Sequence, residues 1–222
     1  MVACLKGMDI IFLGHSSFRI KGKTASIVTD PFDSKMVGLK FSPVEADIVT
    51  VSHNHADHNQ ISLVKNVKKV IQGPGEYEIM GISILGFNSY HDAKEGEERG
   101  KNTIYVFEVD GLRIAHLGDL GHELSEGLVE DLGDIDILMI PVGGEFTIGI
   151  GKAVSVVQAI EPSIIIPMHY QTSGLNPANF AKLAPVEDFL KEVGLAVENL
   201  PKLSLKKEEL GEEQKVVVLE KK

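Results

Sequence analysis

The segment from residue 53 to residue 58 contains three histidines and one aspartate, in a chain that has only eight histidines. These residues are His53, His55, Asp57 and His58. Imidazole and carboxylate groups together suit zinc, manganese or iron. Residues two apart on a helix point to different sides, so His53 and His55 can converge only from a loop at the end of a strand. Asp57 and His58 then lie at the next turn. This arrangement favours two neighbouring metals over a surface loop with incidental histidines.

Three further candidate ligands follow apolar segments that we predict to be strands. They are His91, Asp119 and His169. The cluster at residues 53–58 likewise follows an apolar segment, Asp47–Ser52. Because open α/β sheets bind their ligands at one edge of the strands, we expect these side chains to meet there. A two-metal site needs this larger set, since the cluster alone supplies too few ligands.

Four other residues each have a structural and a functional interpretation. His116 precedes Asp119 on a predicted strand, where a supporting role is favoured over catalysis. His122 is expected near the rim of the pocket and in reach of a substrate. His15 either packs in the core or faces the metals. Tyr170 either donates its hydroxyl group to an oxyanion or packs inward as a structural residue.

Length and composition restrict the class of protein. A chain of 222 residues with 43% hydrophobic residues predicts one folded domain over residues 1–222. Its net charge of −10 disfavours a nucleic-acid partner, because phosphate binding needs clustered Lys and Arg. The single cysteine, Cys4, excludes an internal disulfide and a thiolate-rich metal site. No apolar run approaches the roughly 18 residues of a membrane span. We therefore expect a cytoplasmic protein with no membrane contact.

The first half of the chain reads as a series of short strands. Alternating and continuous apolar segments predict them over Asp9–Gly14, Phe18–Ile20, Ala25–Thr29, Asp47–Ser52, Lys68–Gln72, Glu76–Met80, Ile82–Phe87, Thr103–Val109 and Leu112–Leu117. The pair Asp110–Gly111 predicts a tight hairpin between the last two. These segments indicate an extensive β core.

The second half mixes helices with strands. Apolar residues at helical spacing predict helices around Leu124–Leu132, Ala153–Ile160 and Val186–Val193. Continuous apolar runs at Ile135–Ile140 and Ser163–Pro167 predict buried strands. The tail, Leu203–Leu205 and Val216–Leu219, predicts a closing hairpin around the charged segment Lys206–Lys215. Helices on both faces of a β core, an α/β fold, follow from this reading.

The segment Asp92–Asn102 is charged and follows a candidate ligand. Its cations Lys94, Arg99 and Lys101 are placed to meet a phosphate group. The favoured interpretation is a mobile, solvated loop whose charges nearly cancel.

The run His-Asn-His-Ala-Asp-His at residues 53–58 matches the HxHxDH signature of the metallo-β-lactamase superfamily. His91, Asp119 and His169 follow in the order of that family. The segment Thr29–Phe32 resembles its first motif, an aspartate at a strand end. The resemblance extends from the Gly-His-Ser-Ser run that begins at residue 14 to the Met-His-Tyr run that ends at residue 170.

Three further stretches are most similar to one branch of the superfamily. They are His116–Asp119, Pro141–Thr147 and Pro167–Tyr170. That branch contains the L-ascorbate-6-phosphate lactonase-like proteins and uncharacterised metal-dependent hydrolases. The resemblance implies a four-layer αββα sandwich, with two sheets face to face and helices outside.

The resemblance also implies a ligand set. Carried over by motif, His53, His55 and His91 hold one metal, Asp57, His58 and His169 hold a second, and Asp119 bridges the two. Asp30 orients a ligand histidine or the ligand loop by hydrogen bonding. The two divalent ions are expected to be zinc, with manganese or iron as alternatives.

This set predicts a metal-dependent hydrolase. Two divalent ions lower the pKa of a bridging water, and the resulting hydroxide attacks a carbonyl or phosphoryl centre. Asp57 and Asp119 are the candidate catalytic carboxylates, with a proton relay as a further role for Asp57. The expected substrate is a small ester, lactone or phosphoester. Both a neutral and an anionic substrate stay open.

Two alternatives stay open. One is a phosphodiesterase or nuclease, which salt-sensitive binding of nucleic acid would indicate. The other is a metal-binding protein that binds a metabolite on the same scaffold without turnover. Assays of lactones, thioesters and phosphodiesters with added metal distinguish them. The sequence leaves the oligomeric state open.

Overall fold

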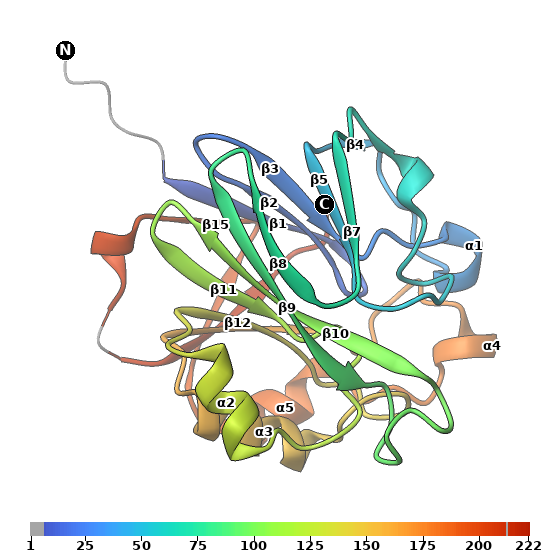
Figure 1. The fold of residues 1–222 in the computed structure, drawn as a ribbon. Coiled ribbons are helices and arrows are strands. Elements are labelled where there is room, and N and C mark those ends of the chain that lie inside the picture. The colour runs from blue at the N-terminus through green and yellow to red at the C-terminus, as the bar shows by residue number, and fades with distance from the viewer. Residues whose placement is uncertain (1–6, 212) are drawn as a thin grey trace.

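Two β-sheets packed face to face form the centre of the computed structural model, which describes residues 7–211 and 213–222 (Figure 1). The first sheet has six strands in the order β15 (Leu203–Leu205), β1 (Met8–Gly14), β2 (Ser17–Lys21), β3 (Ser26–Thr29), β5 (Ile48–Val51) and β7 (Lys69–Gln72). Cys4 lies outside the described residues.

The second sheet has eight strands. Their order is β14 (Ala196–Leu200), β16 (Lys215–Leu219), β13 (Ile164–Met168), β12 (Ile137–Pro141), β11 (Leu112–His116), β10 (Lys101–Val109), β9 (Ile82–Tyr90) and β8 (Gly75–Ile79). A separate two-stranded ladder joins β4 (Val44–Glu45) to β6 (Val64–Lys65). The remaining elements are the α-helices α1 (Ser34–Val37), α2 (Glu126–Leu132), α3 (Ile150–Ile160), α4 (Pro177–Phe180) and α5 (Val186–Val193) and the 3-10 turns η1 (Ile61–Leu63) and η2 (Lys207–Glu209).

Alternation along the central strands divides the apolar residues between two cores. On β12, Ile137 and Met139 point into the space between the sheets, whereas Leu138 and Ile140 point outward. Successive side chains of a strand face opposite sides, so a strand buried on both faces reads as continuously apolar. The prediction that this segment is a doubly covered strand is confirmed.

The two outer layers differ in thickness. Helices α2, α3 and α5 lie against the outer face of the eight-stranded sheet (Figure 1), where Val156 and Phe189 help to bury it. The outer face of the six-stranded sheet is covered by loops and by the one-turn helices α1 and α4, which contribute Val37 and Phe180. The predicted four-layer αββα order is confirmed, with one thin layer.

The predicted hairpin at the C-terminal end is wrong. β15 pairs antiparallel with β1 in the six-stranded sheet, and β16 pairs parallel with β13 and β14 in the other sheet. β15 and β16, neighbours in the sequence, therefore belong to different sheets. The apolar pattern of a short strand specifies its faces and leaves its partner undetermined, so two nearby strands mimic a hairpin.

Other boundaries shift in ways that matter for the site. The helix predicted from Leu124 begins at Glu126, because the Ser125 hydroxyl accepts a hydrogen bond from the Leu128 amide at 3.2 Å and caps it. β9 and β10 are longer than predicted and extend to Tyr90 and from Lys101. The hairpin at residues 110–111 is confirmed, with both residues at positive φ. Strand β14 was not predicted, because exposed apolar residues at the edge of a sheet give no clear alternation.

Among the residues that the structure describes, no helix combines the length and the apolar character that crossing a bilayer requires.

Candidate metal centre

The candidate ligands are carried by loops at strand ends of both sheets. Asp30 directly follows β3, and Ser52 directly follows β5, the parallel neighbour of β3. His91, Asp119 and His169 follow β9, β11 and β13. The structure thus brings the seven predicted ligands to one region. They form three groups that share residues, and within each group the potential ligand atoms lie within 4.8 Å of one another.

Three residues at this centre adopt a backbone conformation that only glycine enters easily. The φ angles are +56° at His15, +41° at Asp30 and +53° at His169. Such angles cost about 1–3 kcal/mol each and cluster at functional sites. The His169 amide also donates to the His15 carbonyl at 2.9 Å, which joins the end of β13 to the β1–β2 turn. The fold therefore holds these side chains in place against a local energetic cost.

The first group consists of His53, His55 and His91. The ring centroids of His53 and His91 are 4.6 Å apart, and those of His55 and His91 are 5.1 Å apart. His53 and His91 are buried, whereas His55 is exposed. His55 lines the two pockets described below, so this ligand group is accessible to solvent through His55.

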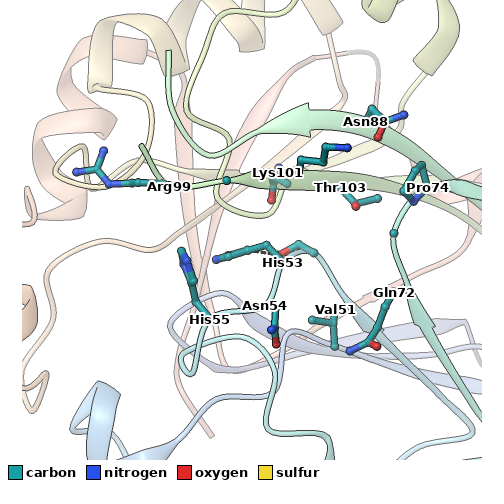
Figure 2. Close-up of a pocket in the computed structure, with 14 residues that line it drawn as sticks. Val51, His53, Asn54, His55, Gln72, Pro74, Asn88, Arg99, Lys101 and Thr103 are labelled. Carbon is teal, nitrogen blue, oxygen red and sulfur yellow. Dashed lines mark hydrogen bonds between the residues drawn. The ribbon is translucent and has the colours of Figure 1, made fainter. Parts of the chain in front are cut away.

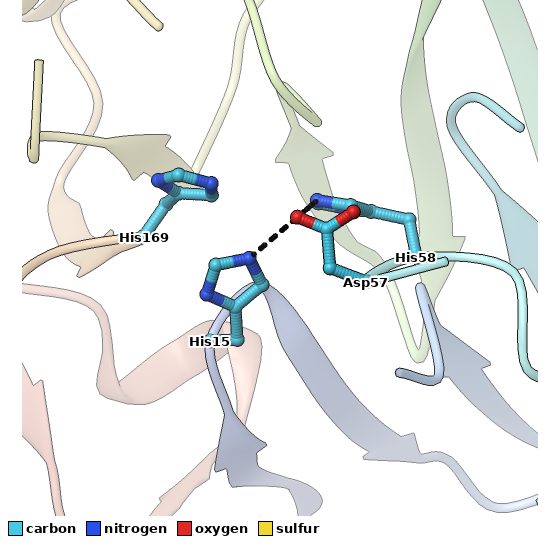
Figure 3. A group of neighbouring side chains, drawn as sticks. All are labelled: His15, Asp57, His58 and His169. Carbon is cyan, nitrogen blue, oxygen red and sulfur yellow. Dashed lines mark hydrogen bonds and ion pairs between the residues drawn. The ribbon is translucent and has the colours of Figure 1, made fainter. Parts of the chain in front are cut away.

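The second group consists of His15, Asp57, His58 and His169, all buried (Figure 3). Asp57 Oδ2 lies 3.3 Å from His15 Nε2 and 3.7 Å from His58 Nε2. The ring centroids of His15 and His169 are 4.2 Å apart. The sequence left His15 between a core and a metal-facing role, and the structure places it beside the metal candidates.

Asp119 lies between the two groups. Its Oδ2 atom is 3.2 Å from His58 Nε2 and 3.3 Å from both His91 Nε2 and His169 Nε2. His53 Nε2 is slightly farther, at 3.9 Å. One carboxylate oxygen is therefore surrounded by imidazole nitrogens from both groups.

These contacts fit a bound cation. Two ligands of a tetrahedral zinc ion, each about 2.0–2.1 Å from the metal, lie roughly 3.3 Å from each other. The distances from Asp119 to its three nearest imidazole nitrogens have this value. Within the described residues, Nε2 of His53, His58 and His169 and Oδ1 of Asp119 are buried without a hydrogen-bond partner. Buried polar atoms rarely lack partners, and metal ions would satisfy these.

Asp30 determines which ring nitrogens face the centre. Its carboxylate accepts hydrogen bonds from the Ser52 amide at 2.7 Å and the Ser52 hydroxyl at 2.6 Å, and contacts His58 Nδ1 at 2.9 Å. The Ser52 proton is thereby used, so Ser52 Oγ accepts from His53 Nδ1 at 2.9 Å. Both histidines then carry the proton on Nδ1 and present Nε2 to a metal. Asp30 thus orients one ligand of each group.

Two supporting residues were missed at the sequence level. Asn102 is buried. Its side-chain oxygen accepts a hydrogen bond from the Asp119 amide at 3.1 Å, and its side-chain nitrogen donates one to the Leu117 carbonyl at 2.9 Å. Gly118 has φ of +56°, and a Cβ atom there would collide with Asn102 and Ser52. Only the chemistry-bearing residues stand out in a sequence, whereas these two act through their contacts with the Asp119 loop.

Burial and charge act in opposite directions on the buried groups. Burial lowers the pKa of His53 to about 3 and the pKa of His15 to about 4. Burial also lowers the pKa of His58, but the carboxylates of Asp119 and Asp57 outweigh it and raise that pKa well above 6.5. Burial raises the pKa of Asp119, but His169 and His58 hold it well below its usual value. In the metal-free protein, protons on histidines therefore balance ionised carboxylates.

These shifts predict that the metal-free protein is most stable near pH 6.5. Below that pH, His15 and His53 stay neutral when folded and take up protons on unfolding, so the free energy of unfolding rises with pH. Above it, the folded state retains the His58 proton that the unfolded state has lost, so the free energy of unfolding falls. Urea unfolding of chelator-treated protein at pH 5.5, 6.5 and 8.5 measures this.

The zinc-loaded protein serves as the control for that measurement. Its ligand histidines are already deprotonated, so the decline above pH 6.5 should be absent. A metal-free protein whose urea midpoint rose steadily to pH 8.5 would contradict the assignment.

His116 lies outside the ligand groups. Its Nδ1 accepts the Gly118 amide at 3.2 Å, so Nε2 carries the proton and donates to the Ser16 carbonyl at 2.8 Å. Both nitrogens are used, and the ring ties the Asp119 loop to the β1–β2 turn. The structural interpretation of His116 agrees with these contacts.

The structure does not bring His122 or Tyr170 to the centre. His122 Nε2 accepts the Tyr90 amide at 3.1 Å, and Nδ1 donates to the Glu123 carbonyl at 2.8 Å. The Tyr170 ring packs against the outer core, with its centroid 6.5 Å from that of Phe12. Neither residue is among those that line the two pockets at the metal centre.

Two pockets meet at the ligand groups. One, of about 500 Å³, has Asp57, His91 and Asp119 in its wall. The other, of about 570 Å³, borders His53 and the ends of β9 and β10 (Figure 2). His55 and Arg99 line both. A substrate can therefore reach the candidate metals from two sides.

Comparisons with known proteins agree with this geometry. A family model described as the β-lactamase superfamily domain matches residues 9–169. A UPF0173 metal-dependent hydrolase of Thermococcus onnurineus is 29% identical, with 79% of this chain and 92% of the relative covered. One of Thermococcus kodakarensis is 31% identical, with 74% and 85% covered. The crystal structure of a Thermotoga maritima protein, described as a candidate Zn-dependent hydrolase of the metallo-β-lactamase superfamily, is 39% identical with a TM-score of 0.76 and covers 96% of this chain and 98% of that one.

Proposed function

Because the chain belongs to the metallo-β-lactamase superfamily and, within it, to the UPF0173 metal-dependent hydrolases, we propose that it hydrolyses a small ester, lactone or phosphoester with two metal ions. The family supplies the general class, a metal-dependent hydrolase. The number of metals, their identity and the substrate class are the additional content of the proposal.

One observation carries the two-metal assignment. The Asp119 carboxylate lies within 3.3 Å of His91 from the first ligand group and of His58 and His169 from the second. A single carboxylate in contact with both groups supports a bridging ligand. His53, His55 and His91 would then hold one ion, and Asp57, His58 and His169 would hold the other.

Two divalent cations would supply Lewis acidity, which lowers the pKa of water and polarises the substrate oxygen. The chain itself positions the proton acceptor. Asp57 lines the smaller pocket, and its Oδ2 accepts a hydrogen bond from His15 Nε2 at 3.3 Å. Burial raises the pKa of Asp57, but His58 and His15 hold it below its usual value. The carboxylate therefore stays ionised, as a metal ligand must, and a proton relay between attacking water and leaving group is its second proposed role.

Zinc is the proposed metal, with manganese or iron as alternatives. Imidazole and carboxylate ligands suit all three, and the Thermotoga relative is described as a candidate Zn-dependent hydrolase. Pockets of about 570 and 500 Å³ support a small-molecule substrate, since such sites usually measure about 300–1,000 Å³. The net charge of −10 supports the absence of a nucleic-acid partner.

Removal of metal tests the proposed function. Chelator-treated protein is reloaded with zinc, manganese or iron and assayed on phenyl esters, lactones and a phosphodiester such as bis(4-nitrophenyl) phosphate. We expect turnover of at least one class only after reloading, because the proposed nucleophile is a water molecule that the metal ions activate. Equal turnover by the metal-free protein would contradict the mechanism. Inactivity of the metal-loaded protein on every class would instead indicate a binding protein.

A further inference from the structure

The two pockets at the metal centre differ in chemical character. The smaller one contains three large apolar side chains, Met36, Phe146 and Phe180, next to the ligands. The larger one contains amide side chains, among them Asn54 and Gln72, and no large aromatic residue. One side of the centre therefore suits an apolar group, and the other suits a polar one.

The aromatic side is built onto the second ligand group. The Phe146 ring centroid is 6.0 Å from that of Phe180 and 6.4 Å from that of His169. The Phe180 centroid is 5.0 Å from that of His15. Both phenylalanines thus form a wall directly beside the candidate metal ligands, where an apolar substituent next to the cleaved bond would pack.

Two basic residues without an ion-pair partner among the described residues, Arg99 and Lys101, lie at the pockets. No aspartate or glutamate is among the residues that line the larger pocket, although acidic residues outnumber basic ones in the chain. That pocket contains Lys101 and Arg99, and within the described part of the chain neither forms an ion pair. Their charges are available to a ligand.

Arg99 extends past His55 and away from the end of the pocket at Asn88 and Pro74 (Figure 2). Its guanidinium carbon lies 5.6 Å from the centroid of the Phe146 ring. A cation over an aromatic face is stabilised there while its edges stay free to bind an anion. Arg99 therefore connects the charged and the aromatic sides of the site.

The loop that carries Arg99 is held in one conformation by hydrogen bonds, whereas its composition predicted a mobile loop. The Asp92 carboxylate accepts hydrogen bonds from the amides of Lys94, Gly96, Glu98 and Arg99, at 2.8, 2.9, 3.1 and 2.8 Å. The backbone at Arg99 is thus tied to the residue that follows His91.

We propose that Arg99 selects substrates in which an anionic group lies beside an apolar one. The apolar group packs against Phe146 and Phe180, and the guanidinium beside Phe146 binds a carboxylate or phosphate oxygen of the same substrate. The proposal deepens, and rests on, the hydrolase function, because Arg99, Phe146 and Phe180 line the same pocket as the candidate ligands His91 and Asp119.

Binding of three unreactive probes to the zinc-loaded protein tests this directly. Calorimetry compares 4-phenoxybutanoate with its neutral analogue 4-phenoxybutanol and with butanoate, which lacks the ring. We expect 4-phenoxybutanoate to bind roughly tenfold more tightly than either, because a hydrogen bond to a charged group and a buried ring each add about that much. Equal affinities for the acid and the alcohol, or for the acid and butanoate, would overturn the proposal.

Variants assign the preference to Arg99. In Arg99→Gln the advantage of the acid over the alcohol should disappear, and in Arg99→Lys it should persist in reduced form. Lys94→Gln is the matched control, since Lys94 belongs to the same loop but pairs with Glu98 at 2.6 Å outside both pockets. If the advantage survived in Arg99→Gln, the metals or Lys101 would be its source and the assignment to Arg99 would be wrong.

A parallel assay separates this proposal from the hydrolase function. Monophenyl succinate and phenyl butanoate are esters that differ in one terminal carboxylate. If neither is cleaved while the probes still show the Arg99-dependent preference, the ester activity fails and the specificity proposal stands. If both are cleaved with equal kcat/KM by wild type and Arg99→Gln, the specificity proposal fails and the hydrolase stands.

Discussion

Replacing Asp119 with alanine is expected to abolish binding of the two proposed metal ions and all metal-dependent hydrolysis. Its carboxylate is fully buried and contacts nitrogens of His58, His91 and His169. Loss of a residue that only hydrogen-bonds to a metal ligand lowers metal affinity about 10–100-fold. Loss of a ligand shared by both ions should cost at least about 100-fold at each.

Elemental analysis and hydrolysis assays of Asp119→Ala after zinc loading and desalting measure this effect. Asp131→Asn is the control, because Asp131 is an exposed residue on α2, away from the centre. The two variants should differ in metal content and activity while both remain folded by circular dichroism. Full metal content in Asp119→Ala would show that Asp119 is not a shared ligand.

The second large effect is expected at Asp30, a residue that touches no metal in this account. Asp30→Ala removes the acceptor for the Ser52 amide and hydroxyl and for His58 Nδ1. The His53 and His58 rings then lose the bonds that turn Nε2 toward the centre, so zinc affinity should fall about 10–100-fold. The metal-free protein also loses one of the three carboxylates around the His58 ring and leaves the buried Ser52 amide without its acceptor, which destabilises it by about 1–3 kcal/mol.

Competition with a chromogenic chelator measures the zinc affinity, and urea unfolding measures the stability. Asp47→Ala is the matched control, since Asp47 accepts bonds from the Ser26 amide and hydroxyl but lies outside the centre. It should cost stability without changing zinc affinity. If Asp30→Ala unfolds, Asp30→Asn keeps the volume and tests affinity alone. Unchanged zinc affinity in both Asp30 variants would contradict an orienting role.

Three of the strands that carry candidate site residues, β3, β5 and β13, could be predicted because they are buried on both faces. The continuous apolar run at residues 164–168, directly before His169, has few alternatives in a chain of this composition. The ligands then follow from chemistry, since histidines and aspartates at strand ends have little structural reason to gather. The fold class could therefore be predicted from the sequence, and the assignment of these residues as metal ligands stays a prediction.

The parts that could not be predicted depend on contacts between distant segments. The pairing of β15 with β1 and of β16 with β13 is decided by which sheet each strand completes, and their apolar patterns are alike. The order of residues 92–100 depends on one carboxylate that binds four amides, which a charge count does not reveal. His15 shares a group with His169 only because the fold joins their loops.

Anomalous diffraction from crystals of the zinc-loaded protein, measured at the zinc absorption edge, tests the two-metal claim most directly. We expect two anomalous peaks per chain. One should contact His53, His55 and His91, the other Asp57, His58 and His169, and both should contact Asp119. A single peak, or a second peak that Asp119 does not touch, would contradict the two-metal claim.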